Sequence, residues 1–237
     1  MNPILHITQY CERGADPALI AEPFNALSNL AFFLVAFAAF AKLPATAAGV
    51  DTRAERALIA LVTLVGIGST LFHTFATPWA MAADVVPIGA FVLAYAILAS
   101  RRFLSLSWGE TSIGMTLLVA SQAAAGLMRC NGGPCLNGST GYVPALCLLV
   151  AVAIATLKTC PKAAPRLFAA AAVFALALTL RSLDLILCDT IVIFGKTRGT
   201  HALWHLLNAA TIALLLDAAI KTAPVYLKDC APRQLVP

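Results

Sequence analysis

The chain has 237 residues, of which 60% are hydrophobic and only 11% are charged, and its mean hydropathy is +0.86. Soluble domains carry about a quarter charged residues, so this composition excludes a water-soluble globular protein and predicts one that lies in a membrane. The net charge of +5 does not indicate a nucleic-acid-binding protein, because the basic residues are scattered between apolar runs instead of being clustered with aromatic residues.

The sequence contains seven apolar segments, each close to the roughly 20 residues that a helix needs to cross hydrocarbon. They lie at residues 23–43, 57–75, 79–100, 111–128, 142–157, 167–187 and 200–220. The polar stretches between them are short, and no internal repeat is visible. We therefore predict an all-α integral membrane bundle of seven transmembrane helices, with an extracytoplasmic N-terminal segment (1–22), a helical domain (23–220) and a cytoplasmic tail (221–237).

The loop charges predict how this bundle is oriented. Most of the 16 Lys and Arg residues fall on one side of the seven segments, and basic loops stay on the cytoplasmic side of a membrane. The N-terminus is then outside and the C-terminus inside, which places Cys160 and Cys230 on the cytoplasmic side. The first twenty residues lack the pattern of a cleaved signal peptide and are expected to remain in the mature protein.

Four of the seven cysteines fall on the predicted outer side, where disulfides persist: Cys11, Cys130, Cys135 and Cys188. Cys130 and Cys135 bracket a turn sequence that suits a small disulfide loop, and Cys11 could then pair with Cys188. Free thiols are the alternative, because spacing alone does not determine connectivity.

The predicted N-terminal segment carries several oxygen-bearing side chains just ahead of the first span: Glu12, Asp16, Glu22 and Asn25. Calcium prefers such oxygen ligands, so this region is a candidate calcium site. The alternative is that these are ordinary polar residues of a loop beside the membrane.

The second and third segments carry ionisable or polar groups, and an ionisable group inside a span is a candidate for function. His73 closes the second segment, and Ser69 lies one turn deeper on the same face, where its hydroxyl could stabilise an oxyanion. A membrane serine more often bonds its own backbone. Asp84, in the outer turns of the third segment, is the candidate catalytic base; the alternative is that it orients a ligand imidazole.

The sixth and seventh segments add further charged groups. Arg181 and Asp184 are three residues apart on one helix and are predicted to pair. His201 and His205 are four residues apart, the spacing that lets two imidazoles reach one metal, although such a pair can equally be structural. His73 lies at a similar predicted depth, so we predict that the three histidines bind zinc and leave a fourth position for water, as in catalytic zinc sites.

Four stretches of the sequence carry a resemblance to a known family: Cys11-Glu12 with IAEPFNALSNL at 20–30, GIGSTLFH at 66–73, Asp84, and HALWH at 201–205. Over nearly its whole length the chain resembles the alkaline ceramidases, which belong to a wider group of seven-helix hydrolases that includes the progestin and adiponectin receptors. The resemblance implies zinc on the three histidines, proton transfer by Asp84, Ser69 near the oxyanion, and a disulfide between Cys11 and Cys188.

The resemblance is weaker at the calcium pocket of that family, which uses an Asp-Trp-Cys-Glu-x-Asn stretch and a later Glu. The matching stretch here is QYCERG at 9–14, so Gln9 and Gly14 replace two side-chain ligands. The calcium site predicted for this chain therefore consists of Glu12, Asp16 and Glu22.

These observations predict a zinc-dependent amidohydrolase that cleaves a membrane lipid, with ceramide as the substrate that the resemblance implies and a sphingoid base and a fatty acid as products. The active site would face the extracytoplasmic side, and no obligate protein partner is expected. The alternative is a non-catalytic lipid sensor with a structural zinc. A channel or transporter is disfavoured, because its polar residues would be distributed along a path instead of clustering at one end.

Overall fold

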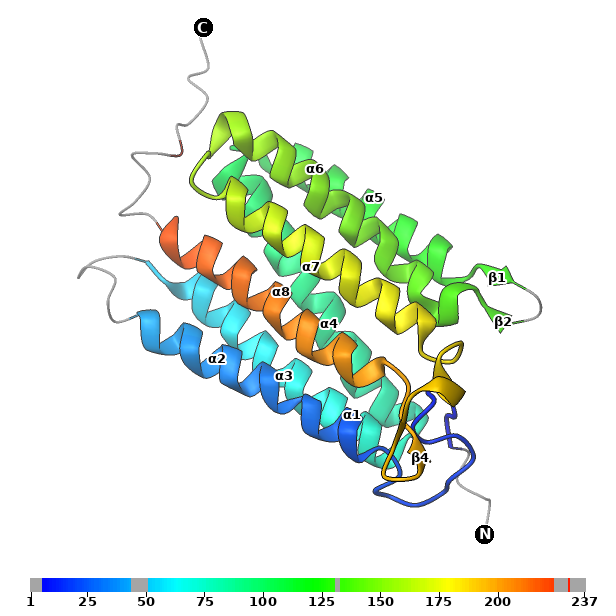
Figure 1. Cartoon of the computed structure of the whole chain (residues 1–237). Coiled ribbons are helices and arrows are strands. Elements are labelled where there is room, and N and C mark those ends of the chain that lie inside the picture. Colours follow the sequence, from blue (N-terminus) through cyan, green and yellow to red (C-terminus); the bar gives the residue numbers. More distant parts are fainter. Residues whose placement is uncertain (1–5, 44–50, 131–132, 224–229, 231–237) are drawn as a thin grey trace, which may run out of the picture.

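The computed structural model describes residues 6–43, 51–130, 133–223 and 230, and its helices form a single bundle (Figure 1). The helices in the described residues are α1 (Pro23–Ser28), α2 (Leu30–Lys42), α3 (Arg53–Phe75), α4 (Pro78–Leu98), the π-helix η2 (Ala99–Phe103), α5 (Trp108–Gly126), the 3-10 helix η3 (Cys135–Tyr142), α6 (Val143–Thr159), α7 (Ala164–Leu183), the 3-10 helix η4 (Cys188–Thr190) and α8 (His201–Lys221). Two small hairpins pair β1 (Arg129–Cys130) with β2 (Gly133–Pro134) and β3 (Val192–Ile193) with β4 (Lys196–Thr197).

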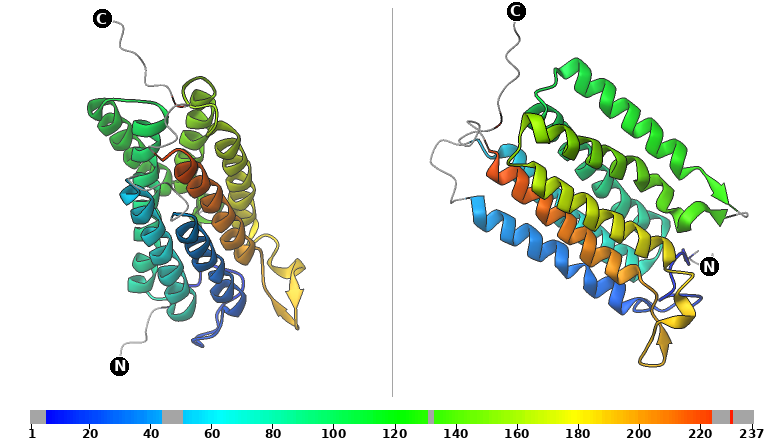
Figure 2. Two further views of the ribbon diagram at one scale, coloured as in Figure 1. Left: turned by 90° about the vertical axis from the view of Figure 1, so that its left-hand side faces the viewer. Right: turned by 45° about the horizontal axis from the view of Figure 1, so that its top comes forward.

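Six segments within the described ranges are long and apolar enough to cross a membrane: Pro23–Lys42, Arg53–Phe75, Pro78–Phe103, Cys135–Thr159, Ala164–Leu183 and His201–Lys221. They coincide with six of the seven predicted spans, so the chain is a multi-pass membrane protein. The remaining predicted span forms α5, where Glu110, Gln122 and several hydroxyl residues make the helix less apolar than the other six. This helix lies at the edge of the bundle (Figure 2).

Local sequence explains where most helices begin. Proline occupies one of the first two positions of α1, α4, α6 and α7, where its missing N–H would have no helical partner. Helix α5 begins instead with a capping box, in which Ser107 and Glu110 each accept a hydrogen bond from the other's backbone N–H.

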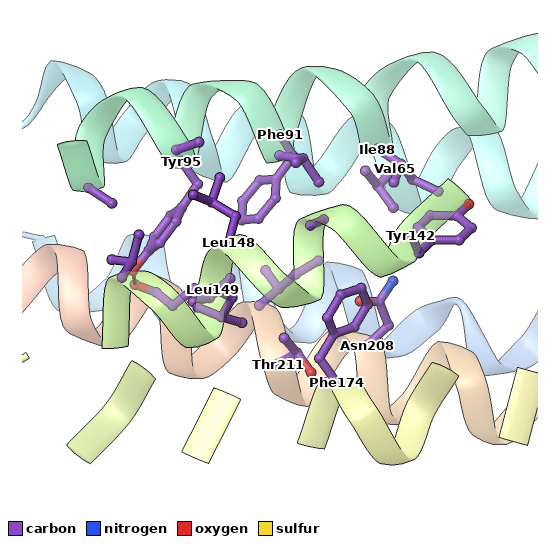
Figure 3. Close-up of a pocket in the computed structure, with 17 residues that line it drawn as sticks. Val65, Ile88, Phe91, Tyr95, Tyr142, Leu148, Leu149, Phe174, Asn208 and Thr211 are labelled. Carbon is purple, nitrogen blue, oxygen red and sulfur yellow. Dashed lines mark hydrogen bonds between the residues drawn. The ribbon is translucent and has the colours of Figure 1, made fainter. Parts of the chain in front are cut away.

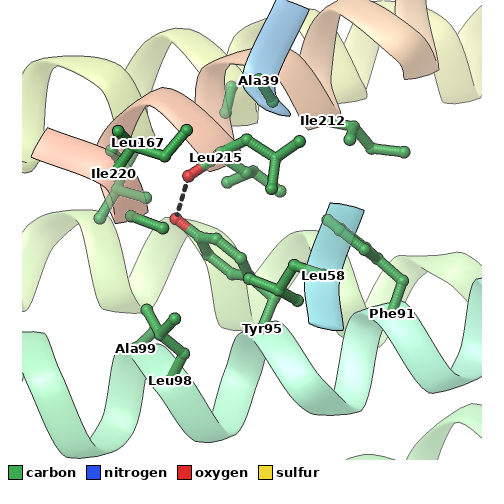
Figure 4. Packing of buried hydrophobic residues seen from close by; sticks show 14 of the residues in the cluster. Ala39, Leu58, Phe91, Tyr95, Leu98, Ala99, Leu167, Ile212, Leu215 and Ile220 are labelled. Atoms are coloured by element: carbon green, nitrogen blue, oxygen red, sulfur yellow. Dashed lines mark hydrogen bonds between the residues drawn. The ribbon is translucent and has the colours of Figure 1, made fainter. Parts of the chain in front are cut away.

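The core lies between α2, α3, α4, α6, α7 and α8 and consists mainly of Ala, Leu, Val, Ile and Phe (Figure 4). A buried hydrogen bond lies within this core: the Tyr95 hydroxyl donates to the backbone carbonyl of Leu215 over 3.0 Å. This bond connects α4 to α8 inside the apolar layer.

Helices α3 and α4 approach each other closely at Gly68. A Cβ atom at this position would lie 1.9 Å from the backbone oxygen of Ala83 on α4. The absence of a side chain at Gly68 therefore sets the distance between the two helices. Ser69 follows Gly68 on α3 and Asp84 follows Ala83 on α4, so this contact lies beside both candidate residues.

The N-terminal segment packs at the end of the bundle where α7 ends and α8 begins, and the β3–β4 hairpin projects from the same end (Figures 1 and 2). Disulfides join Cys11 to Cys188 and Cys130 to Cys135, which confirms both predicted pairs. The first bond ties the N-terminal segment to the loop between α7 and α8.

A third disulfide, between Cys160 and Cys230, was not predicted. Cys160 lies in the turn between α6 and α7, at the opposite end of the bundle from the other two bonds. The loop charges place this end in the cytoplasm, where disulfides are rare. The orientation of the bundle therefore stays a prediction.

Candidate metal centre

Three buried histidines converge at the end of the bundle that the N-terminal segment covers. His73 lies in the last turn of α3, and His201 and His205 lie in the first two turns of α8. One nitrogen from each ring lies within 4.8 Å of the others, and each residue is at most 2% exposed. Among the residues that the structure describes, this is the one group of three or more such side chains placed to hold a metal ion.

Hydrogen bonds at Nδ1 orient two of these rings. His73 Nδ1 lies 2.5 Å from a carboxylate oxygen of Glu22, and His205 Nδ1 lies 2.7 Å from the Ser28 hydroxyl and 3.1 Å from the backbone oxygen of Asn25. When Nδ1 carries the proton in these contacts, Nε2 is left with its lone pair for a metal.

The unpartnered nitrogens of the cluster fit a metal ion. His73 Nε2 and His201 Nδ1 are buried without a hydrogen-bond partner, whereas buried polar atoms in proteins are nearly always paired. Three neutral imidazoles are a donor set that suits zinc, and three protein ligands are the number that catalytic zinc sites use.

Packing holds the third ring in place. The ring of His201 stacks on that of Tyr10, with centroids 3.6 Å apart and an angle of 20° between the planes. The Tyr10 hydroxyl accepts a hydrogen bond of 3.2 Å from Arg181, whose guanidinium also faces the rings of Tyr142 and Trp204. Burial raises the pKa of Tyr10 far above its ordinary value, so the phenol stays neutral beside the histidines.

The predicted pair of Arg181 and Asp184 is wrong. Arg181 donates 2.8 Å hydrogen bonds to the Asn137 backbone oxygen and to the Ser139 hydroxyl, both in η3. Helical spacing identifies neighbours on the same helix only, and here both side chains find partners from distant segments.

Asp184 instead organises the start of α8. Its carboxylate accepts hydrogen bonds from the backbone N–H groups of Thr200 at 2.7 Å, His201 at 2.9 Å and Cys11 at 2.9 Å. The first N–H groups of a helix have no partner within the helix, so this carboxylate satisfies them and fixes the position of His201. Gly199 adopts a φ of +62°, and a Cβ there would lie 2.2 Å from the carboxylate.

The structure also brings Ser69 and Asp84 to the histidines. Ser69 is buried one turn before His73 on α3, and a Cβ on the preceding Gly68 would meet the backbone of Ala83 and Asp84 on α4. Asp84 lies near His73, and its Oδ1 is buried without a hydrogen-bond partner. A carboxylate with one free oxygen beside a metal-binding cluster can accept and return a proton.

The structure does not support the predicted calcium site. Glu12 accepts hydrogen bonds from the backbone N–H groups of Phe24 and Asn25, at 2.9 and 2.8 Å, and pairs with Arg198 at 2.7 Å. The carboxylate of Asp16 accepts from the backbone of Ala18, on the surface.

Glu22 is equally engaged, with Arg13 at 2.6 Å, with His73, and with the Asn25 side-chain amide at 3.0 Å. These hydrogen bonds hold the pKa of Glu22 below its usual range, although burial acts in the opposite direction. The predicted calcium ligands thus do not form a common set of free oxygens.

An apolar groove leads away from this end of the bundle between α3, α4, α6, α7 and α8 (Figure 3). Its lining is hydrocarbon along most of its length and includes Phe91, Leu148 and Leu149. At the end nearer the histidines it is lined by Tyr142 and by Asn208, which follows His205 by three residues on α8.

The fold and this site define a class: multi-pass helical membrane proteins that hold three histidines at one end of the bundle, next to a carboxylate that has one buried oxygen. A sequence model of the family described as Ceramidase matches residues 8–224, which is nearly the whole chain, so the protein belongs to the ceramidase family. No curated protein matches the chain. Membership supports, for the family as a whole, hydrolysis of the amide bond of ceramide and thus a lipid substrate.

Several residues of the site were missed by sequence reasoning, although all lie in or beside the stretches that carry the family resemblance. They are Tyr10, Arg13, Gly68 and Ser28. Gly68 was visible as one of two glycines preceding Ser69. The other three act through contacts between distant segments, which leave no periodic signal in the sequence.

Proposed function

We propose that the protein is a zinc-dependent hydrolase that cleaves the amide bond of ceramide or a closely related N-acyl membrane lipid. The observation that carries this proposal is the convergence of His73, His201 and His205, with unpartnered nitrogens, beside the free oxygen of Asp84. A purely structural zinc would need no such carboxylate.

The residues of the chain have distinct roles in this reaction. His73, His201 and His205 would hold the zinc, which when bound polarises a carbonyl and makes water more acidic. Asp84 takes a proton from the attacking water and delivers one to the leaving nitrogen, so that amide and water give amine and carboxylic acid. The hydroxyl of Ser69, which is buried one turn before His73, would donate its proton to the oxyanion.

The apolar groove is our candidate for the site that holds a hydrocarbon chain of the lipid. It has the lining expected for an acyl or sphingoid chain, and its polar end at Tyr142 and Asn208 lies toward the histidines. A lipid lying in this groove would have its polar linkage near Asp84 and its tail among Phe91, Leu148 and Leu149.

We further propose that α5 is the seventh span and that the site faces the extracytoplasmic side. The disulfides Cys11–Cys188 and Cys130–Cys135 lie at the site's end of the bundle and suit an oxidising compartment. The loop charges agree with this orientation, whereas the bond between Cys160 and Cys230 at the other end does not.

The proposal can be tested by incubating the purified protein with ceramide. Fatty acid and sphingoid base are measured by mass spectrometry, and the metal content is determined in parallel. We expect the two products and about one zinc per chain, and we expect His73→Ala to lose the activity and the zinc. His6→Ala is the matched control, because this histidine lies outside the metal-binding group. Zinc without turnover on any N-acyl lipid would favour the sensor, and protein without zinc would contradict the proposal.

A further inference from the structure

A second buried charge cluster lies directly behind the histidines, and its central residue is Arg13. This side chain is almost fully buried, at 2% exposure, in a protein segment that precedes the first span. Each of its three guanidinium nitrogens donates, to one carboxylate and to four backbone oxygens: Glu22 at 2.6 Å, Asp16 at 3.3 Å, Ala18 at 2.9 Å, His73 at 3.1 Å and Thr74 at 3.2 Å. A guanidinium has five N–H groups, so its donor capacity is fully used.

Arg13 thereby connects three structures that meet at the site. Two of its acceptors are carbonyls in the last turn of α3, which have no partners within the helix and favour a cation. Two others belong to the N-terminal loop itself. The fifth is the Glu22 carboxylate, which uses its second oxygen to contact His73 Nδ1 at 2.5 Å.

A second buried carboxylate, that of Glu12, also has an arginine as its partner. Glu12 pairs with Arg198, whose guanidinium also lies over the ring of Phe24, 4.7 Å from its centroid. Glu22 and Glu12 are thus each balanced by one buried arginine, and the three carboxylates that were predicted to bind calcium already accept hydrogen bonds. A divalent cation would have to displace both arginines to reach six to eight oxygen ligands.

We propose that Arg13 takes the place of a divalent cation in this protein: its guanidinium neutralises Glu22 and fixes that carboxylate on His73, so that the metal site forms without calcium. Arg13 is then a positioning residue for His73, and Arg198 has the matching structural role at Glu12. Like the proposed function, this inference requires that the three histidines bind zinc, but it does not depend on which lipid is cleaved.

Zinc affinity, measured without substrate by competition with a chromophoric chelator, tests the inference on the full-length protein. In Arg13→Gln we expect zinc binding to weaken by about 10- to 100-fold, the usual effect of losing a residue that supports a metal ligand. Arg13→Lys keeps the charge beside Glu22 but loses the fork of hydrogen bonds. It should retain most of the zinc affinity while its melting temperature falls about as far as that of Arg13→Gln.

Arg129→Gln is the control, because this arginine is exposed and, within the described part of the chain, donates to the backbone oxygens of Gly126 and Met128. Equal loss of zinc affinity in the Lys and Gln variants would reduce Arg13 to a packing role and overturn the inference. If Arg13→Gln does not fold, the double variant Arg13→Gln with Glu22→Gln removes both charges. Recovery of folding with weakened zinc binding would support the inference, and unchanged zinc affinity would contradict it.

Calcium provides an independent arm on the unaltered protein. Calcium at about 1 mM, which fills even weak extracellular sites, should change neither the melting temperature nor the zinc affinity relative to the same protein in EGTA. A rise in either quantity with calcium would overturn the inference. If zinc binding follows these expectations but the protein hydrolyses no N-acyl lipid, the proposed function is contradicted and the role of Arg13 is not affected.

Discussion

Side chains at the candidate metal centre are of two kinds: the three histidines, which we propose bind the ion, and the residues that hold the histidine rings in place. His73 is oriented by Glu22, His205 by Ser28, and His201 by stacking on Tyr10. Each ring is therefore supported by a residue from the N-terminal segment or from α1 and not from its own helix. The geometry of the site depends on these supporting contacts as much as on the histidines.

Replacing Asp84 separates catalysis from metal binding. Asp84→Asn removes the group that we propose transfers protons but leaves the three imidazoles, so we expect hydrolysis to fall about 10²- to 10⁴-fold with zinc content unchanged. Product release and metal analysis on the same sample measure the two effects. Asp189→Asn, on an exposed residue of η4, is the control. Equal activity of the Asp84→Asn variant and the unaltered protein would show that Asp84 only orients a histidine.

At the residue scale the sequence predicted the histidines but not their surroundings. Helical spacing and matching depth were sufficient to group His73 with His201 and His205. The same spacing argument failed for Arg181 and Asp184, because burial allowed each to bond with residues far away in the chain. Counting oxygen atoms likewise predicted a calcium site where Arg13 already provides the positive charge.

Among the elements, the contact between α3 and α4 decides whether Asp84 reaches the site. Gly68→Ala would place a methyl group against the Ala83 carbonyl, so the helices must separate. We expect a loss of about 1 to 3 kcal/mol of stability, the usual cost of overpacking, and a fall in activity larger than the fall in zinc content. Gly114→Ala, with open space around it on α5, is the control. Unchanged activity in Gly68→Ala would show that Asp84 needs no such close approach.

The apolar groove makes a prediction about chain length. Leu149→Trp fills part of the groove away from the histidines, so we expect ceramides with long acyl or sphingoid chains to be cleaved more slowly than short-chain ones. Competition between ceramides of different chain lengths in one vesicle preparation gives the ratio directly. Leu117→Trp, at an exposed position on α5, should leave the ratio unchanged. The same selectivity in both variants would exclude the groove as the chain site.

At the scale of elements, six spans could be predicted because their apolar runs are long and uninterrupted. The starts predicted at residues 23 and 79 lie within one residue of the structural starts, Pro23 and Pro78, where proline marks the beginning of the helix. Helix α5 forms where a helix was expected. Its polar residues make it less apolar than the other predicted spans, so composition alone does not identify it as a membrane span. The break between α1 and α2 at Asn29 was not predicted, although the polar residues Ser28 and Asn29 interrupt the apolar run there.

For the whole molecule, the proposed orientation can be tested by labelling. With Cys147, the free thiol among the described cysteines, changed to Ser, Phe194→Cys at the tip of the β3–β4 hairpin should react with a membrane-impermeant maleimide in intact cells. Trp108→Cys, at the start of α5, should react only after permeabilisation. Both positions are exposed in the folded protein. The reverse pattern would invert the bundle and would bring the Cys160–Cys230 bond to the oxidising side.

The bond between Cys11 and Cys188 has a consequence for biosynthesis. Residues at the start of the chain must wait for the loop before the last helix, 177 positions later, before they can be fixed over the histidines. Two of the three candidate ligands lie in α8. A ribosome-bound chain therefore lacks part of the candidate metal centre until α8 has been made, and the proposed function predicts that a truncated product without α8 is inactive on the lipids around it.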